Sequence, residues 1–369
     1  MYTKLTLDGA DAYRKSERME VFSGDGISMS HAGLVTADSR YCGKYVSSLL
    51  IGGIGTSPEY RRNGCVRMML EEAFAMAPER GWAVSLLHPF SAAYYRKFGY
   101  EKISDHKIVE FPMSFLSHIP RCPDLVPYDE SRLGDVLSLY EKFGDKRNIM
   151  FRRYNGSRYG TDGRRIYIRY GSDGTPAGYV ILRGENYYDV NRMVSVNLHV
   201  DELVFTSPES LTDLFGFIRM YEGEFDSVKI HNCAMSPEVD NMLREYVNVK
   251  YTLVSDIMAR VLDVKAMLEA NRYPEHRGHF RVYVDDTLDF TRGLWEVEYE
   301  GGIGQARKLD GCDNWDVYAP MPAFSQMIYG YEQYDEYSAP YIPGVKVSGN
   351  CGDFFRAFPK RYNGLFEHF

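Results

Sequence analysis

The sequence has no long apolar run. Within its 369 residues no stretch approaches the roughly 18 consecutive apolar residues that a membrane-spanning helix needs. Residues 1–7 (MYTKLTL) alternate in polarity, as a short strand does, and lack the charged start and apolar core of a secretory signal. We therefore expect a protein that neither crosses a membrane nor carries a signal peptide.

Cysteine is scarce and scattered. The six cysteines contain no Cys-x-x-Cys pair, the spacing typical of zinc ribbons and redox sites. We expect free thiols in a reducing cytoplasm. His276 and His279 form a lone His-x-x-His without an evident third ligand, so we expect solvated histidines and no metal site. The cysteines are Cys42, Cys65, Cys122, Cys233, Cys312 and Cys351.

Excess positive charge is also absent. Lysine and arginine number 43 against 51 aspartate and glutamate, which gives a formal net charge of −8. A nucleic-acid-binding protein needs a basic surface, so this balance argues against that class. An acidic protein attracts cationic ligands, although the same charge can serve solubility alone. The length and the hydrophobic fraction of 44% predict a globular chain of two or three domains.

The most informative segment runs from Ser47 to Gly81. It begins with an apolar strand, 49–56, that contains three glycines, and glycine within a strand marks a bulge or the close approach of a ligand. Pro58 ends the strand because proline cannot donate to a β-ladder. Residues 61–64 (Arg-Arg-Asn-Gly) lead into a helix that Gly81 is placed to end. The apolar face of this helix consists of Val66, Met69, Leu70, Ala73 and Phe74.

A helix that begins after a basic, glycine-containing turn suits an anionic ligand. The N–H groups of the first turn and their partial positive charge bind phosphate oxygens. Gly64 permits close approach of the backbone, and Arg61, Arg62 and Arg67 add positive charge. The preceding strand can pair with an amide-bearing arm, so the two features together describe coenzyme A. The alternative is an ordinary strand–turn–helix connection with solvated arginines.

This segment resembles the acetyl-CoA-binding motif of the GNAT acetyltransferase superfamily, an apolar strand followed by Arg/Gln-x-x-Gly-x-Gly/Ala. Here the motif spans residues 61–66, with Val66 in place of the small last residue. The resemblance implies acetyl-CoA as co-substrate, with its pantetheine arm paired to the strand and its pyrophosphate over the amides of the turn. The implied cofactor-binding residues are Ile54, Gly55, Thr56, Arg61, Arg62, Asn63, Gly64, Cys65 and Val66.

The strand predicted at 82–87 is followed by a Tyr-x-x-x-Gly element, Tyr95 to Gly99. On the GNAT resemblance Tyr95 is the general acid, since a phenol near the sulfur can protonate the leaving thiolate. Ordinary core packing is the alternative for Tyr95, and Tyr94 should face elsewhere. His88, at the end of the strand, is a candidate base, although satisfied and partly buried histidines are commoner in such positions.

An internal repeat indicates a second unit of the same kind. The sequence Thr-Ser-Pro-Glu at 56–59 recurs at 206–209, each time after an apolar strand and before a helix. The second copy continues with 210–213 (Ser-Leu-Thr-Asp) where the first has its basic glycine turn, so it should not hold a pyrophosphate. Residues 165–169 and 177–183 are predicted to form a hairpin within this degenerate unit.

With a third α/β segment after it, this arrangement resembles the enhanced-intracellular-survival (Eis) type of acetyltransferase over nearly the whole chain. The resemblance implies an α/β (α+β) fold with two tandem GNAT domains and a sterol-carrier-protein-like C-terminal domain. The segment before the cofactor strand is short for this family. The predicted domains are 1–120, catalytic; 121–263, degenerate; and 264–369, sterol-carrier-protein-like. The matching motifs are Arg61–Arg67, Pro89–Ser91, Val200–Val204, Gly293–Trp295 and Phe354–Phe358.

Eis-type enzymes place the C-terminal carboxylate of the chain in the first domain's site and assemble as hexamers. Carried over, the carboxylate of Phe369 is the base that deprotonates the amine, and its ring anchors the end of the chain; a frayed terminus is the alternative. We thus predict a cytoplasmic, homo-oligomeric N-acetyltransferase that acetylates primary amines of cationic small molecules, aminoglycoside- or polyamine-like. The alternatives are a protein lysine acetyltransferase and a non-catalytic lipid- or acyl-CoA-binding module.

Overall fold

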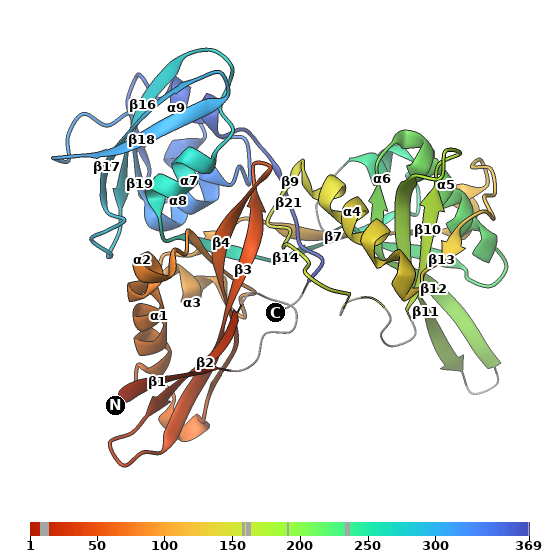
Figure 1. The fold of residues 1–369 in the computed structure, drawn as a ribbon, viewed down its shortest axis with the longest axis horizontal. Coiled ribbons are helices and arrows are strands. Elements are labelled where there is room, and N and C mark those ends of the chain that lie inside the picture. The colour runs from red at the N-terminus through yellow and green to blue at the C-terminus, as the bar shows by residue number, and fades with distance from the viewer. Residues whose placement is uncertain (8–14, 157–158, 160–163, 190–191, 233–236, 368) are drawn as a thin grey trace.

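The described part of the chain forms three large β-sheets with helices packed against them and one small two-stranded sheet (Figure 1). The computed structural model describes residues 1–7, 15–156, 159, 164–189, 192–232, 237–367 and 369. The mixed α/β class predicted from the sequence is confirmed. Over the described residues, no helix is both long and apolar enough to cross a membrane.

The first sheet contains the glycine-rich strand. Its strands are β1 (Tyr2–Leu7), β2 (Lys15–Phe22), β3 (Ser28–Tyr41), β4 (Lys44–Thr56), β5 (Val84–Leu87), β6 (Glu101–Lys102) and β15 (Met258–Val261). Their order is β1-β2-β3-β4-β5-β15-β6; among the described pairs β4 and β5 run parallel, and the others run antiparallel. One face shares a core with α1 (Cys65–Ala75). The short elements nearby are η1 (Pro58–Tyr60), α2 (Ala77–Arg80) and α3 (Ala92–Arg96).

The second sheet has strands β7 (Asp105–Pro112), β8 (Val126–Pro127), β10 (Arg165–Tyr170), β11 (Pro176–Asp189), β12 (Arg192–Phe205), β13 (Ser227–Asn232) and β14 (Lys250–Ser255). They lie in the order β14-β7-β13-β12-β11-β10-β8. Helices α4 (Leu133–Gly144) and α5 (Pro208–Ile218) cover opposite faces, because alternate residues of β11 join the core of one helix or the other. The remaining elements are η2 (Met113–Leu116), η3 (Glu130–Arg132), η4 (Arg219–Tyr221) and α6 (Glu238–Asn241).

The first two sheets exchange strands across the predicted boundaries. β7 follows the first sheet in sequence but pairs with β13 and β14 of the second. β15 follows the second sheet in sequence but lies between β5 and β6 of the first. The boundary at 120/121 therefore falls after the chain has already entered the second sheet, and residues 258–261 belong to the first sheet although the prediction assigned 121–263 to the degenerate unit.

The third sheet has the order β18-β17-β16-β19-β20. Its core continues into the face of the first sheet that α1 leaves uncovered, so the two units share one hydrophobic cluster. The sterol-carrier-protein-like assignment of this part remains a prediction. Its elements are α7 (Val264–Ala270), β16 (Gly278–Asp285), β17 (Gly293–Glu300), β18 (Ile303–Leu309), β19 (Val317–Pro320), α8 (Met321–Ile328), η5 (Ala339–Tyr341), β20 (Lys346–Val347) and α9 (Gly352–Ala357).

The C-terminal tail leaves the third sheet and passes between the other two (Figure 1). Strand β21 (Tyr362–Asn363) pairs in parallel with β9 (Arg147–Asn148). Farther along, Glu367 accepts a hydrogen bond of 2.6 Å from Nε of the buried Arg153, which also forms two contacts of 2.9 and 3.0 Å with the fully buried Glu202. The tail is thus fixed to the second domain by backbone pairing and by a buried ionic network.

Most local predictions are confirmed. The strand predicted at 49–56 is the second part of β4, and the predicted helix begins as α1, with Cys65 buried and Val66 half-buried. It does not run unbroken to Gly81: α1 ends at Ala75, and Gly81 ends the separate short helix α2. The hairpin predicted from 165–169 and 177–183 is β10 and β11. Five cysteines are free thiols; Cys233 lies outside the described residues.

Candidate active site

Strands β4 and β5 run side by side for only part of their length. Their pairing joins 48–50 to 84–86, and β4 then continues to Thr56 with β3 on its other edge. Within the described residues, no strand pairs with the second edge of 51–56. Backbone N–H and C=O groups on that edge are therefore available to an amide-bearing ligand. The predicted pantetheine-binding residues Ile54, Gly55 and Thr56 lie on this edge.

The turn before α1 has the geometry of an anion site. Gly64 is the N-cap residue at φ +81°, a conformation that costs an L-residue about 1–2 kcal/mol. No side chain caps α1, and a Cβ atom on Gly64 would meet nothing within 4 Å. The first-turn N–H groups thus lack a side-chain acceptor, and space is open beside them.

The predicted basic residues differ in their surroundings. Arg61 donates from Nε to the carbonyl oxygen of Thr56 at 3.4 Å, while Arg62 and Asn63 are exposed. Arg67 forms an ion pair of 3.2 Å with Glu71. Arg61 and Arg62 therefore stand at the rim of the open turn, whereas Arg67 already has a carboxylate partner. Cys65 is buried in the core and offers the site only its backbone.

A buried arginine, Arg260, packs against the Tyr-x-x-x-Gly element. Gly99 has φ +85°, and a Cβ atom there would lie 1.6 Å from Nη1 of Arg260, so both conformation and space require glycine. Arg260, on β15, is 1% exposed; it donates to the carbonyl oxygen of Phe98 and contacts both carboxylate oxygens of Asp286 at 3.0 and 2.9 Å. Strand β15 of the first sheet and Asp286 of the third domain therefore both support the element that carries Tyr95.

Tyr95 itself is 3% exposed and surrounded by rings. Its ring centroid lies 5.3 Å from those of Phe90 and Tyr94 and 6.0 Å from that of Tyr100. Burial, with a smaller contribution from Tyr94, raises the pKa of Tyr95 to about 12. The phenol therefore keeps its proton at neutral pH, as a general acid must. The same burial fits the core-packing alternative, so the role of Tyr95 remains a prediction.

The C-terminal residue lies against the cofactor strand. A Cβ atom on Gly52 would lie 2.8 Å from the carboxyl carbon of Phe369 and 3.0 Å from its oxygen. The Phe369 ring lies 4.9 Å from the His88 ring and 5.6 Å from that of Phe151. Packing of this kind does not fit a frayed terminus, and it brings the terminal carboxylate to the first domain (Figure 1). Whether that carboxylate acts as a base is a separate prediction.

His88 has a carboxylate partner from a distant part of the sequence. Its Nδ1 lies 3.1 Å from Oδ1 of Asp256, which is 8% exposed and precedes β15. An imidazole held by a carboxylate beside an open site has the arrangement of an oriented base, and it equally satisfies a partly buried structural histidine. Both interpretations of His88 stay open.

Sequence reasoning missed Asp256, Arg260 and His31. A Cβ atom on Gly55 would lie 2.6 Å from Cε1 of His31 on β3, so this glycine makes room for an imidazole beside the strand edge. A signal existed for Arg260, because it is a charged residue in the otherwise apolar run 257–262. Asp256 and His31 have no comparable signal, since each is placed by pairing between strands far apart in sequence.

Two stretches of the sequence match models of known protein families. Residues 7–103 and residues 147–261 each match a model described as an acetyltransferase (GNAT) domain. The chain is therefore a GNAT acetyltransferase with two tandem GNAT domains. No curated protein sequence matches the chain.

Solved structures with the same fold cover nearly the whole chain. A GCN5-related N-acetyltransferase from Anabaena variabilis has a TM-score of 0.81 at 17% identity, over 95% of this chain and 89% of that one. One from Kribbella flavida has a TM-score of 0.78 at 18% identity, over 95% and 87%. Eis1 from Mycobacterium abscessus has a TM-score of 0.74 at 16% identity, over 95% and 90%. At these identities the likeness establishes the shared fold.

Proposed function

We propose that the first GNAT domain transfers an acetyl group from acetyl-CoA to a primary amine of a cationic small molecule. The pantetheine arm pairs with the open edge at Ile54–Thr56, and the pyrophosphate lies over the amides of residues 62–66, with Arg61 at the rim. Uncapped amides, an open edge and a positive-φ glycine in one strand–turn–helix support this assignment.

Two groups supply the proton transfers. The amine gives a proton to the Phe369 carboxylate, and its nitrogen attacks the thioester carbonyl. The tetrahedral intermediate then collapses as the C–S bond breaks and Tyr95 gives its proton to the leaving sulfur. The Tyr95 phenolate takes the second proton of the nitrogen, which leaves a neutral amide and restores the phenol. The carboxylate also attracts an ammonium group before transfer, which favours polyamine- or aminoglycoside-like acceptors.

The observation that carries this proposal is the position of Phe369. Its carboxyl group lies close enough to β4 that any side chain on residue 52 would displace it. Arg153 and the β21–β9 pairing hold the tail in this path from the second domain. The degenerate domain therefore has a use in the proposal: it positions the base.

The test is release of free thiol from acetyl-CoA, measured with aminoglycosides, polyamines and lysine peptides, on protein with an unmodified C-terminus. Tyr95→Phe keeps the ring, so core packing survives while kcat should fall about 10²–10³-fold. Tyr94→Phe is the matched control and should retain activity. An unchanged rate in Tyr95→Phe would reduce Tyr95 to a core residue.

A separate variant tests the Phe369 carboxylate as the base. Gly52→Ala should displace the Phe369 carboxyl group and lower kcat, while Gly134→Ala, a glycine in α4 with nothing within 4 Å of its Cβ position, should not. Deletion of Phe369 should give the same loss as Gly52→Ala. If deletion leaves kcat intact and His88→Gln abolishes it, the base is the His88–Asp256 pair.

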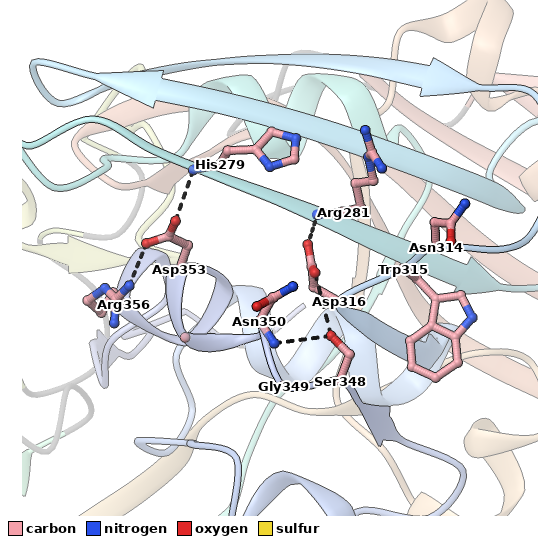
Figure 2. A pocket seen from close by; sticks show the side chains of 11 residues that line it. His279, Arg281, Asn314, Trp315, Asp316, Ser348, Gly349, Asn350, Asp353 and Arg356 are labelled. Atoms are coloured by element: carbon pink, nitrogen blue, oxygen red, sulfur yellow. Dashed lines mark hydrogen bonds and ion pairs between the residues drawn. The ribbon is translucent and has the colours of Figure 1, made fainter.

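The alternative functions make different demands. A protein lysine acetyltransferase would turn over the lysine peptides in preference to polycationic amines. A lipid-binding module would need an apolar cavity in the third domain. The third domain has a pocket of about 890 Å³, but polar groups line it, including His279, Arg281, Asp316 and Asp353 (Figure 2). This pocket suits a lipid poorly.

Self-association, as a hexamer by resemblance, belongs to the same proposal. The edge strand β14 supports it, because Tyr251, Leu253 and Val254 are 46%, 58% and 47% exposed. An apolar edge strand is a surface on which a second copy can pair. Light scattering of the wild type and of Leu253→Lys measures this; an oligomer unchanged by the substitution would place the interface elsewhere.

A further inference from the structure

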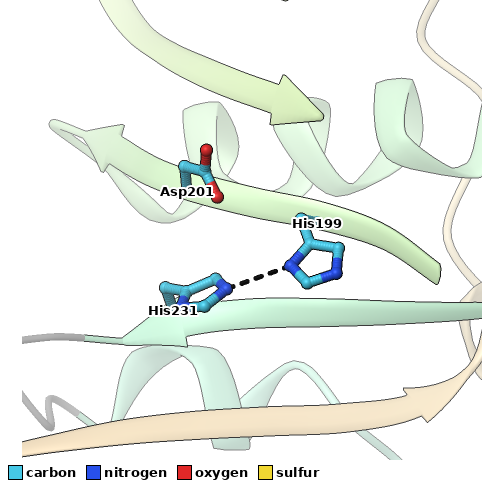
Figure 3. Close-up of side chains that lie close together, drawn as sticks. All are labelled: His199, Asp201 and His231. Carbon is cyan, nitrogen blue, oxygen red and sulfur yellow. Dashed lines mark hydrogen bonds between the residues drawn. The ribbon is translucent and has the colours of Figure 1, made fainter. Parts of the chain in front are cut away.

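Three side chains of ligand type meet on the second sheet. His199 and Asp201 lie on β12, where Asp201 is the extra residue of a β-bulge opposite β11, and His231 lies on the neighbouring parallel strand β13. One donor atom from each lies within 4.8 Å of the other two (Figure 3). This cluster belongs to the second domain and takes no part in the proposed acetyl transfer.

The two imidazoles are spaced and oriented as metal ligands are. Nδ1 of His199 lies 3.2 Å from Nε2 of His231, close to the separation of about 3.3 Å between two nitrogens bound tetrahedrally to one zinc ion. Nε2 of His199 lies 2.9 Å from Oε2 of Glu185. Because a carboxylate only accepts, Nε2 carries the hydrogen, and the lone pair of Nδ1 points into the cluster.

His231 also has an outer partner. Its Nδ1 lies 3.1 Å from Nε2 of His106 on β7, so the nitrogen away from the cluster is supported by a second imidazole.

Two arginines place positive charge at the cluster. Arg183 approaches Nδ1 of His199 at 3.2 Å and Oδ1 of Asp201 at 3.3 Å, and Arg164 approaches Oδ2 of Asp201 at 3.3 Å. Both side chains are partly exposed, 40% and 33%, so either can move into solvent at little cost. The cluster is thus already arranged around a cation, and a guanidinium occupies part of the position.

We propose that His199, Asp201 and His231 bind one divalent transition-metal ion of the zinc class, which displaces Arg183. Two nitrogens and one carboxylate oxygen are a ligand set that zinc accepts, with a fourth position left to water. The ion would tie β12 to β13 in the domain that anchors the C-terminal tail.

The test uses the full chain, stripped with EDTA and then dialysed. Zn²⁺ is titrated by calorimetry, and Co²⁺ by its visible absorption, which reports tetrahedral coordination. We expect one equivalent to bind and the melting temperature to rise. His231→Gln and Asp201→Asn should weaken binding at least tenfold, and Glu185→Gln about 10–100-fold. His276→Gln, at an exposed histidine in the third domain, is the control and should change nothing.

Arg183→Gln gives the sharpest discrimination. If the arginine competes with the metal, its removal should tighten Zn²⁺ binding. If it tightens nothing and instead abolishes binding of inorganic phosphate, the cluster is an anion site and the proposal falls. The proposal falls equally if the stripped wild type binds no Zn²⁺, or if Asp201→Asn, which keeps the shape of the side chain, binds as well as the wild type.

Discussion

The two GNAT domains share a strand–Thr-Ser-Pro-Glu–helix sequence but end it differently. In the first domain residues 58–60 form a short 3-10 turn, and α1 begins only after Gly64, with no side-chain cap. In the second, α5 begins at once at Pro208, and Ser207 and Ser210 cap each other's backbone N–H groups. Relative to the shared motif, the helix of the first domain thus starts seven residues later than that of the second, and its N-terminus is open where the other is capped.

This difference gives a physical reason why the second domain should not bind a pyrophosphate at its helix. A helix must satisfy its first N–H groups with a ligand, with water or with its own chain. The second domain satisfies them with two serine hydroxyls, and Glu209 lies where an anion would approach. The helix of the second domain therefore needs no ligand at its N-terminus. One contribution of this domain to the first is the tail, which Arg153 and β9 hold in place.

The largest effect on stability is expected from a substitution that releases the C-terminal tail from the second domain. Arg153→Met removes the guanidinium that bridges Glu202 and Glu367, and it leaves these two buried carboxylates without that cation. We expect a loss of about 3–5 kcal/mol in the free energy of unfolding, measured with denaturant. Arg121→Met, at an exposed pair with Glu222, is the control and should cost less than about 1 kcal/mol. Equal losses would contradict the buried-network account.

The next effect tests the open helix. Gly64→Val forces a branched side chain into positive φ, and we expect acetyl-CoA binding to weaken about tenfold, corresponding to about 1–2 kcal/mol of strain. Calorimetric titration measures it. Gly174→Val creates the same strain at φ +79° in a turn of the second domain, and it should leave the affinity unchanged.

The closed helix should respond in stability alone. Ser207→Ala removes the cap of α5 and should cost about 1 kcal/mol of unfolding free energy without altering acetyl-CoA affinity. Ser57→Ala, at the equivalent repeat position, removes no cap and should cost almost nothing. If Ser207→Ala weakened acetyl-CoA binding, the second domain would have kept a ligand site.

The last prediction is that kcat does not depend on the titration of Tyr95 near neutral pH. Because the pKa of Tyr95 is raised to about 12, the phenol stays protonated well above neutrality. Measured kcat should therefore show no decline due to Tyr95 from about pH 7 to about pH 10. A decline within that range that disappears in Tyr95→Phe would show that the phenol titrates there.

Local features of the site were predictable, and distant ones were not. Gly64 and Pro58 act on their immediate neighbours, so the strand, turn and helix follow from the sequence between 49 and 75. The buried Arg260 beneath Gly99 depends on β15 entering a sheet formed mainly by residues before 103, and no local pattern encodes that pairing. The cluster of His199, Asp201 and His231 escaped notice for the same reason, since parallel neighbours bring it together.

The exchange of β7 and β15 between the two sheets affects how the chain can fold during synthesis and where its gene can be divided. During synthesis the first domain cannot complete its sheet until residue 261 has left the ribosome. Completion of this sheet therefore follows synthesis of the whole second domain. A gene fragment that encodes only the first 120 residues would lack the strand between β5 and β6 and would expose β7 without its partners. Truncation therefore cannot separate the first domain from the second, and gene recombination can transfer the two domains only together.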